Sequence, residues 1–135
     1  MTPELQDQLQ EIIKTSTFTV HDGSYVYAKV SGQPSLDDAF MMSRDDDEVT
    51  AVFESGKADK FEVIEQNKDL RKLIELRISK PFYSTGFLAA VTKAISSKGC
   101  NNLLVCTYTK DYVLVTEQQF DKAKEALLEI GFREA

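Results

Sequence analysis

The sequence is poor in the residues that carry most metal binding and catalysis. Its 135 residues include one histidine, two cysteines and no tryptophan. A structural zinc site takes four cysteine or histidine ligands, so His21, Cys100 and Cys106 are too few to form one. Positions 100 and 106 of a single extended strand would lie ~20 Å apart, whereas a disulfide spans at most ~7 Å between Cα atoms. We therefore expect no zinc site and, if both cysteines share a strand, no disulfide between them.

The chain also lacks a basic cluster and a long apolar run. It has 16 Lys and Arg against 22 Asp and Glu, a formal charge of −6. Without a basic patch it has no electrostatic footprint for a nucleic-acid backbone. No apolar run approaches the ~20 residues that a membrane-spanning helix needs, and the first ten residues do not resemble a signal peptide. We therefore expect no nucleic-acid partner, no membrane partner and a cytoplasmic location.

Catalytic signatures are missing as well. The sequence contains no glycine-rich phosphate loop, no nucleophile elbow and no metal-binding motif. His21 precedes the turn signal Asp22-Gly23, where we expect it to be exposed and without the positioned partner that acid-base chemistry needs. Cys106 follows apolar residues and is expected to be a buried, inert thiol, whereas Cys100 is expected to be more exposed. We therefore expect a protein that is not an enzyme and holds no cofactor.

Apolar periodicity predicts one helix and several strands in the first half. Residues 2–14 have helical spacing, and residues 17–30 read as a β-hairpin around Asp22-Gly23. Two further strands, 39–43 and 49–53, flank the acidic run 44–48. Several carboxylates in a row suit a hard cation such as calcium. Because the run lacks the glycine and the spaced ligands of an EF-hand loop, a solvated hairpin tip is the favoured interpretation.

The second half has a sharper pattern. It predicts a strand at 73–78, a helix that Thr85 caps and Gly99 ends, strands at 102–106 and 112–115, and a helix that ends at Gly131. Thr116 and Gln119 have the spacing of a capping box for that last helix. This element order is strand, helix, strand, strand, helix, which is a ferredoxin-like unit that lacks one strand. Only four residues follow the last helix, so the missing strand must come from the first half.

These patterns predict an α+β fold. We expect two interlocked ferredoxin-like βαββαβ modules, with an antiparallel sheet and helices on one face. The expected boundaries are residues 1–70 for a degenerate module and 71–135 for the more clearly patterned one.

Residues 79–91, SKPFYSTGFLAAV, resemble the ACT domain, a small-molecule-sensing module of amino-acid metabolism. In that family the loop after the first strand ends in a glycine at the start of the first helix, as Gly86 does here. The Gly-Phe-Leu-Ala string also resembles the regulatory domains of aspartate kinases. The chain as a whole is similar to small proteins built of two ACT-like units, an architecture shared with eukaryotic cytosolic amino-acid sensors. It departs from them at Thr109-Lys110-Asp111, where members carry a His-Asp-His turn, and at Glu48, where they carry glycine.

The resemblance implies an amino acid or similar small molecule bound at a module or subunit interface. The start of a helix offers unpaired N–H donors to a carboxylate, and Gly86 allows close approach to the backbone. The candidate ligand-binding residues are Tyr83, Ser84, Thr85, Gly86, Phe87, Asn101, Asn102 and Asp111. A plain structural role is the alternative, with Thr85 as a helix cap and the two asparagines as turn residues.

The sequence therefore supports two functional hypotheses. The first is a non-catalytic regulatory ACT-domain protein that binds an amino acid and forms a homodimer. The second is an assembly module that pairs through a sheet edge or its helices without any ligand.

Overall fold

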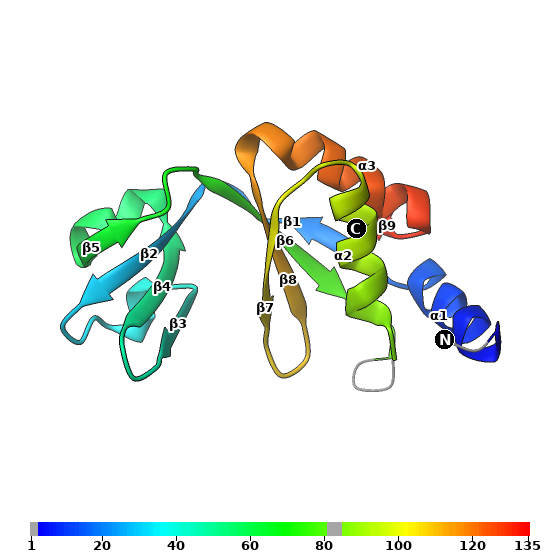
Figure 1. Cartoon of the computed structure of the whole chain (residues 1–135), viewed down its shortest axis with the longest axis horizontal. Coiled ribbons are helices and arrows are strands. Elements are labelled where there is room, and N and C mark those ends of the chain that lie inside the picture. Colours follow the sequence, from blue (N-terminus) through cyan, green and yellow to red (C-terminus); the bar gives the residue numbers. More distant parts are fainter. Residues whose placement is uncertain (1–2, 81–84) are drawn as a thin grey trace. The chain divides into compact units, whose positions relative to one another are not determined.

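The computed structural model describes residues 3–80 and 85–135, and the chain divides into two compact units (Figure 1). The larger unit combines the residues up to His21 with Leu73–Ala135, and the smaller unit is Asp22–Lys72. Residues 3–21, which the sequence places with the first module, therefore pack with the second half of the chain. No helix among the described residues is long and apolar enough to span a bilayer.

The sheet of the larger unit is built around β6 (Arg71–Arg77), whose first two residues belong to the smaller unit. One side of β6 pairs with β1 (Thr17–Val20) and the other with β8 (Asp111–Thr116). β7 (Asn102–Cys106) pairs antiparallel with β8, and the short β9 (Arg133–Glu134) lies parallel to β1. The strand order in this unit is therefore β9, β1, β6, β8, β7.

The strand that the second half lacks is β1. It pairs antiparallel with β6, with Thr17 opposite Arg77 and Val20 opposite Ile74. Phe18 lies opposite Leu76, and both side chains are 0% exposed. The sequence-based expectation that the first half supplies the missing strand is therefore confirmed.

The predicted hairpin over residues 17–30 is wrong in its pairing. Both strands exist, but β1 pairs with β6 and β9, whereas β2 (Tyr25–Ser31) pairs with strands of the smaller unit. Gly23 does turn the chain, with a φ of +82°, yet the turn leads from one unit into the other. A local hairpin would leave one edge of β6 without a partner and Phe18 outside the core, so the distant pairing prevails over the local turn signal.

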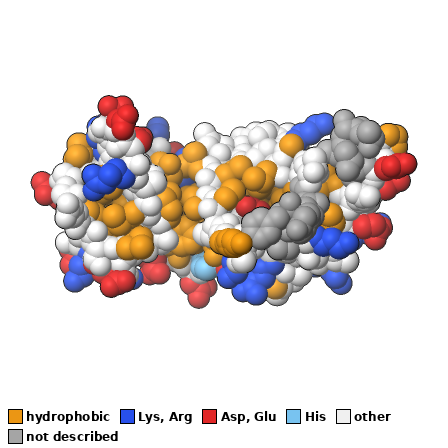
Figure 2. Space-filling view, turned by 90° about the horizontal axis from the view of Figure 1, so that it is seen from below, with side chains coloured by type: hydrophobic (Ala, Val, Ile, Leu, Met, Phe, Trp, Pro, Cys, Tyr) orange, Lys and Arg blue, Asp and Glu red, His pale blue; other side chains and the backbone are white. Residues whose placement is uncertain are grey.

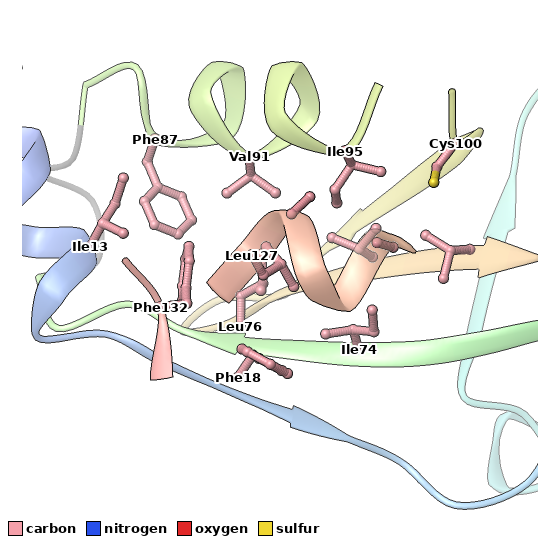
Figure 3. Close-up of a cluster of buried hydrophobic side chains, with 14 of the residues drawn as sticks. Ile13, Phe18, Ile74, Leu76, Phe87, Val91, Ile95, Cys100, Leu127 and Phe132 are labelled. Atoms are coloured by element: carbon pink, nitrogen blue, oxygen red, sulfur yellow. The ribbon is translucent and has the colours of Figure 1, made fainter. Parts of the chain in front are cut away.

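Three helices contribute to the core of the larger unit: α1 (Pro3–Lys14), α2 (Phe87–Ser97) and α3 (Phe120–Ile130). Their apolar side chains meet the residues that alternate along one face of the sheet, as Figure 3 shows for Val91, Leu127 and Ile74. The helices end as predicted, because Gly99 and Gly131 follow α2 and α3 with positive φ angles of 77° and 119°. This arrangement confirms the predicted α+β architecture with helices on one face of an antiparallel sheet.

The smaller unit is an antiparallel sheet with the strand order β3 (Met41–Arg44), β4 (Val49–Glu54), β2, β5 (Glu62–Gln66) and no α-helix. β2 lies between β4 and β5, and β3 pairs with the far side of β4. Short 3-10 helices occupy Leu36–Asp38 and Ser55–Lys60. The core includes Phe53 and Phe61, whose rings stack with centroids 4.2 Å apart.

The acidic run 44–48 closes the β3–β4 hairpin as predicted. The Asp45 Oδ1 atom accepts hydrogen bonds from the backbone N–H groups of Asp47, at 2.8 Å, and Glu48, at 2.9 Å. One of its carboxylates is therefore used to build the turn itself. The described residues include no group of three or more His, Cys, Asp or Glu side chains that could hold a metal ion.

Candidate functional site

A surface hollow of about 440 Å³ lies at the start of α2 in the larger unit. The end of β6, the start of α2 and the start of β8 meet there, at the end of the sheet where the β7–β8 turn lies in Figure 1. Its lining consists of Ile78, Thr85, Gly86, Phe87, Leu88, Ala89 and Asp111. This volume falls within the ~300–1,000 Å³ range of small-molecule sites. Four of the eight predicted ligand-binding residues, Thr85, Gly86, Phe87 and Asp111, are thus brought together.

The start of α2 is formed by Gly86 rather than by the predicted cap Thr85. Gly86 is the N-cap residue, has a left-handed φ of +82° and makes no side-chain cap bond, while Thr85 is exposed. Helical bonding begins with the Ala90 N–H, which donates to the Gly86 carbonyl at 2.9 Å. The first N–H groups of a helix have no partner within it and carry a partial positive charge. This end of α2 therefore presents donors suited to an anionic group, beside the hollow.

Asp111 places a carboxylate on the opposite wall of the hollow. It is half-buried at the start of β8 and lies opposite Cys106 in the β7–β8 ladder. The pKa of Cys106 is raised to about 11, first by partial burial of the thiol and second by the hydrogen bond with the Asp111 carboxylate and the charge of that carboxylate. The hollow therefore combines helix N–H donors on one side with a negative charge on the other.

The solvent exposures of the two cysteines are the reverse of those expected. Cys100 is 5% exposed and lies in the core, whereas Cys106 is exposed. β7 pairs only with β8 among the described residues, so the end of β7 is open to solvent, whereas Cys100 lies beneath the end of α2. Both thiols are free, as expected.

Asn101 and Asn102 lie away from the hollow. They follow the C-terminal end of α2, an 11-residue helix that separates them from its start by ~16 Å. The Asn101 backbone N–H donates to Gln119 Oε1 at 2.8 Å, and Asn102 opens β7 opposite Val115. The structure thus gives both asparagines structural roles away from this hollow, and the ligand contacts predicted for them stay a prediction. The predictions for Tyr83 and Ser84 lie outside the described residues.

The predicted capping box at Thr116 and Gln119 is not formed. The Thr116 side chain makes no cap bond, and a short 3-10 helix, Glu117–Gln119, precedes α3. The Gln119 side chain instead accepts from the Asn101 N–H and donates to the Gly99 carbonyl at 3.2 Å. Gln119 therefore holds the turn between α2 and β7.

Sequence reasoning missed a buried charged cluster on β6. Glu75 is 4% exposed, and its Oε1 atom lies 2.9 Å from His21 Nε2. Its Oε2 atom contacts Arg77 Nε and lies 3.9 Å from Lys110 Nζ. His21 also lies edge-on to Tyr112, with ring centroids 6.0 Å apart. The expectation that His21 has no positioned partner is therefore wrong.

Glu75 remains ionised despite its burial. Desolvation, the largest single influence, acts to raise the pKa of Glu75, but hydrogen bonds from His21 and Arg77 and the charges of Arg77 and Lys110 together lower it. The signal in the sequence is a glutamate between two apolar residues, Ile74 and Leu76, in a strand that is buried on both faces.

Charge is dispersed elsewhere on the surface. Figure 2 shows acidic and basic side chains interspersed, without a large region of one sign on the face in view. Ion pairs such as Lys98–Glu129, at 3.0 Å, and Lys124–Glu134, at 2.9 Å, join neighbouring elements of the larger unit. Exposed pairs of this kind contribute little to stability.

Comparison with known proteins finds a family resemblance in the second half of the chain. Residues 71–129 match the family model of the ACT domain. No curated protein matches the sequence. A Vibrio cholerae protein of unknown function, described as a possible transport protein, superimposes with a TM-score of 0.78 at 22% identity over 94% of this chain and 98% of that one.

Two further solved structures have the same fold. A protein from Agrobacterium tumefaciens gives a TM-score of 0.67 at 21% identity over 89% of this chain and 92% of that one. The regulatory subunit of aspartate kinase from Thermus thermophilus gives 0.59 at 11% identity over 85% and 95%. Residues 71–129 of this chain therefore resemble the ACT domain family, within an α+β, ferredoxin-like fold that the chain shares with these proteins.

Proposed function

We propose that the protein is a non-catalytic regulatory ACT-domain protein whose hollow at the start of α2 binds an amino acid. One observation carries the proposal: the hollow places the start of a helix and the Asp111 carboxylate against the same space. A zwitterion carries the complementary pair of charges. Its carboxylate matches the helix N–H donors, and its ammonium group matches Asp111.

The other walls of the hollow suit the remainder of such a ligand. Ile78 and Leu88 are half-buried apolar residues that can contact a side chain. Asp111 at present bonds to the Cys106 thiol, which is a weak donor. An ammonium group forms a stronger, charge-assisted bond with a carboxylate. Ligand binding would therefore replace a weak partner of Asp111 with a stronger one.

A regulatory role rather than catalysis fits the composition of the hollow. Asp111 is its one titratable residue among the described residues that line it, whereas acid-base catalysis commonly needs a positioned partner. The similar Thermus protein is a regulatory subunit of an aspartate kinase. Binding would act by favouring one arrangement of the chain or of its partners, and only to the extent that the ligand prefers that arrangement.

Thermal-shift measurements with each of the twenty amino acids, at millimolar concentration, test the proposal. A ligand at 100 times its Kd adds about 2.7 kcal/mol to the folded state, which raises Tm by several degrees. Asp111→Asn should abolish the response. The control Asp121→Asn removes an exposed carboxylate from the first turn of α3 and should leave the response intact. A flat response of the wild-type protein to all twenty amino acids would refute the proposal.

Assembly without a ligand is the second candidate function, and the edge of β7 favours it. β7 pairs only with β8 in the described part of the chain, and Leu104 on it is 39% exposed. An unpaired edge can accept a strand from a second copy, which would give a homodimer. Sedimentation equilibrium of the wild type and Leu104→Lys tests this, because a charge at that position should weaken a dimer formed through β7. An unchanged molecular mass would exclude this edge as the interface.

A further inference from the structure

Glu75 receives contacts from three separate parts of the larger unit. His21 follows β1, Arg77 is on β6 itself, and Lys110 comes from the turn before β8. The Tyr112 hydroxyl on β8 also hydrogen-bonds with Glu75, whose charge contributes, after burial, to raising the pKa of Tyr112. A buried carboxylate is costly when one of its partners is removed. Displacement of one partner should therefore require the others to adjust.

Two partners of Glu75, Lys110 just before β8 and Tyr112 on it, flank the residue that lines the hollow. Lys110, Asp111 and Tyr112 are consecutive, and neighbouring residues of an extended strand point to opposite faces of the sheet. Asp111 faces the hollow at the start of α2, whereas Lys110 and Tyr112 face Glu75 on the other side. A change in the position of Asp111 therefore alters the backbone that carries two of the Glu75 partners.

Another partner of Glu75, His21, lies where the chain leaves the larger unit. It is the last residue of that unit before the chain enters Asp22–Lys72. Its backbone N–H donates to the Leu73 carbonyl at 2.9 Å, which extends the β1–β6 ladder by one bond. Leu73 is in turn the first residue of the larger unit after the chain returns. The hydrogen bond between His21 and Leu73 thus joins the two points at which the chain passes between the units, which we call the chain crossings.

We propose that Glu75 is a positioning residue that couples the hollow beside Asp111 to the chain crossings at His21 and Leu73. A change at Asp111 moves Lys110 and Tyr112, Glu75 follows its partners, and the end of β1 at His21 shifts with it. The regulatory meaning of this coupling rests on the function proposed above, in which Asp111 contacts the ligand. The coupling itself is a property of the unliganded protein and can be measured without any ligand.

His21 provides the readout, because it is the single histidine of the chain and its ring Cε1–H gives one proton NMR signal. The signal is recorded at one fixed pH in the wild type, Asp111→Asn, Glu75→Gln and the double variant. Asp121→Asn is the control, because it removes the same charge from α3. Asp111→Asn should shift the His21 signal and Asp121→Asn should not.

The double variant decides the outcome. If Glu75 carries the coupling, the shift caused by Asp111→Asn should be lost in the Glu75→Gln background, because coupled residues give non-additive effects. Additive shifts, or no effect of Asp111→Asn on His21, would overturn the proposal. If Glu75→Gln fails to fold, Lys110→Met combined with Tyr112→Phe replaces it, and an undiminished effect of Asp111→Asn in that background would likewise overturn it. Because no ligand is used, failure here is distinct from failure of the amino-acid binding proposal.

Discussion

The N-terminal segment should be required for the larger unit to fold, although the whole smaller unit separates the two in sequence. A fragment of residues 71–135 keeps α2, α3 and the four strands β6, β7, β8 and β9 but loses α1 and β1. It thereby loses the core residues Leu9, Ile13 and Phe18, which are 8%, 4% and 0% exposed. Burial of a side chain of this size contributes ~1.5–3 kcal/mol, so the three together contribute about 5–9 kcal/mol. A whole domain has a net stability of only about 5–15 kcal/mol.

Loss of β1 also exposes one edge of β6, which promotes aggregation. We therefore expect the fragment 71–135 to be unfolded or aggregated by circular dichroism and NMR. Addition of a peptide of residues 1–24 should restore a folded complex, because it supplies α1 and β1 together. The full-length chain, unfolded in urea under the same conditions, gives the reference stability.

Matched substitutions in the full-length chain locate the effect. Phe18 and Phe53 are both 0% exposed, one in the core of each unit. Each change to alanine should cost about 3–5 kcal/mol. Phe18→Ala should shift NMR signals of residues 73–135, and Phe53→Ala should shift those of residues 22–72. A fragment 71–135 that unfolds cooperatively, with the stability of the full-length chain, would refute the reasoning.

Three other predictions concern single residues. Gly86→Ala should destabilise the protein in urea by about 1–2 kcal/mol, because Gly86 has a φ of +82° that other residues adopt at a cost. The control Gly56→Ala should be nearly neutral, because Gly56 has no left-handed φ and nothing lies within 4 Å of the added methyl group. Equal losses of stability at the two positions would show that the left-handed φ of Gly86 is not the cause. The pKa of Glu75 is lowered in the folded state, so its contribution to stability is present above the ordinary carboxyl pKa and is lost as pH falls through the lowered value. Glu75→Gln should therefore flatten the pH dependence of the stability measured in urea over that acid range. An unchanged slope in the variant would argue against this role of Glu75. Cys106 should be alkylated slowly at pH 8 despite its exposure, because its pKa is about 11 and the thiolate is the reactive form. Buried Cys100 should react only when the protein unfolds. Labelling is followed by mass spectrometry, and rapid labelling of Cys106 in the native state would count against the raised pKa.

Local patterns in the second half were sufficient to predict most of its architecture. The alternation around β6 and the glycines that end α2 and α3 gave the element order, and the shortfall of one strand indicated a donor in the first half. The donor itself was not identified, because Asp22-Gly23 is a strong local signal for a hairpin. Pairing of β1 with β6 joins Phe18 to Leu76 across the chain, and no local pattern reports such a pairing.

The candidate site was predicted in part. Thr85, Gly86, Phe87 and Asp111 do surround one hollow, since the start of a helix and the start of an adjacent strand meet at one end of the sheet. Asn101 and Asn102 do not, because the length of α2 carries them to its other end. The cluster around Glu75 could not be found from spacing, since its partners come from distant segments and a lone charged residue in a strand ordinarily faces solvent.

The origin of β1 has a consequence for synthesis on the ribosome. Residues 17–20 leave the ribosome long before their partner strand β6, whose Leu76 lies opposite Phe18. At about 5–20 residues per second, β1 waits several seconds while the smaller unit, Asp22–Lys72, emerges complete. The smaller unit can therefore fold first, and its closure brings its two ends, which continue into β1 and β6, within reach of each other. Phe18 of the nascent chain stays unburied during that interval, and transiently exposed apolar side chains of this kind promote aggregation.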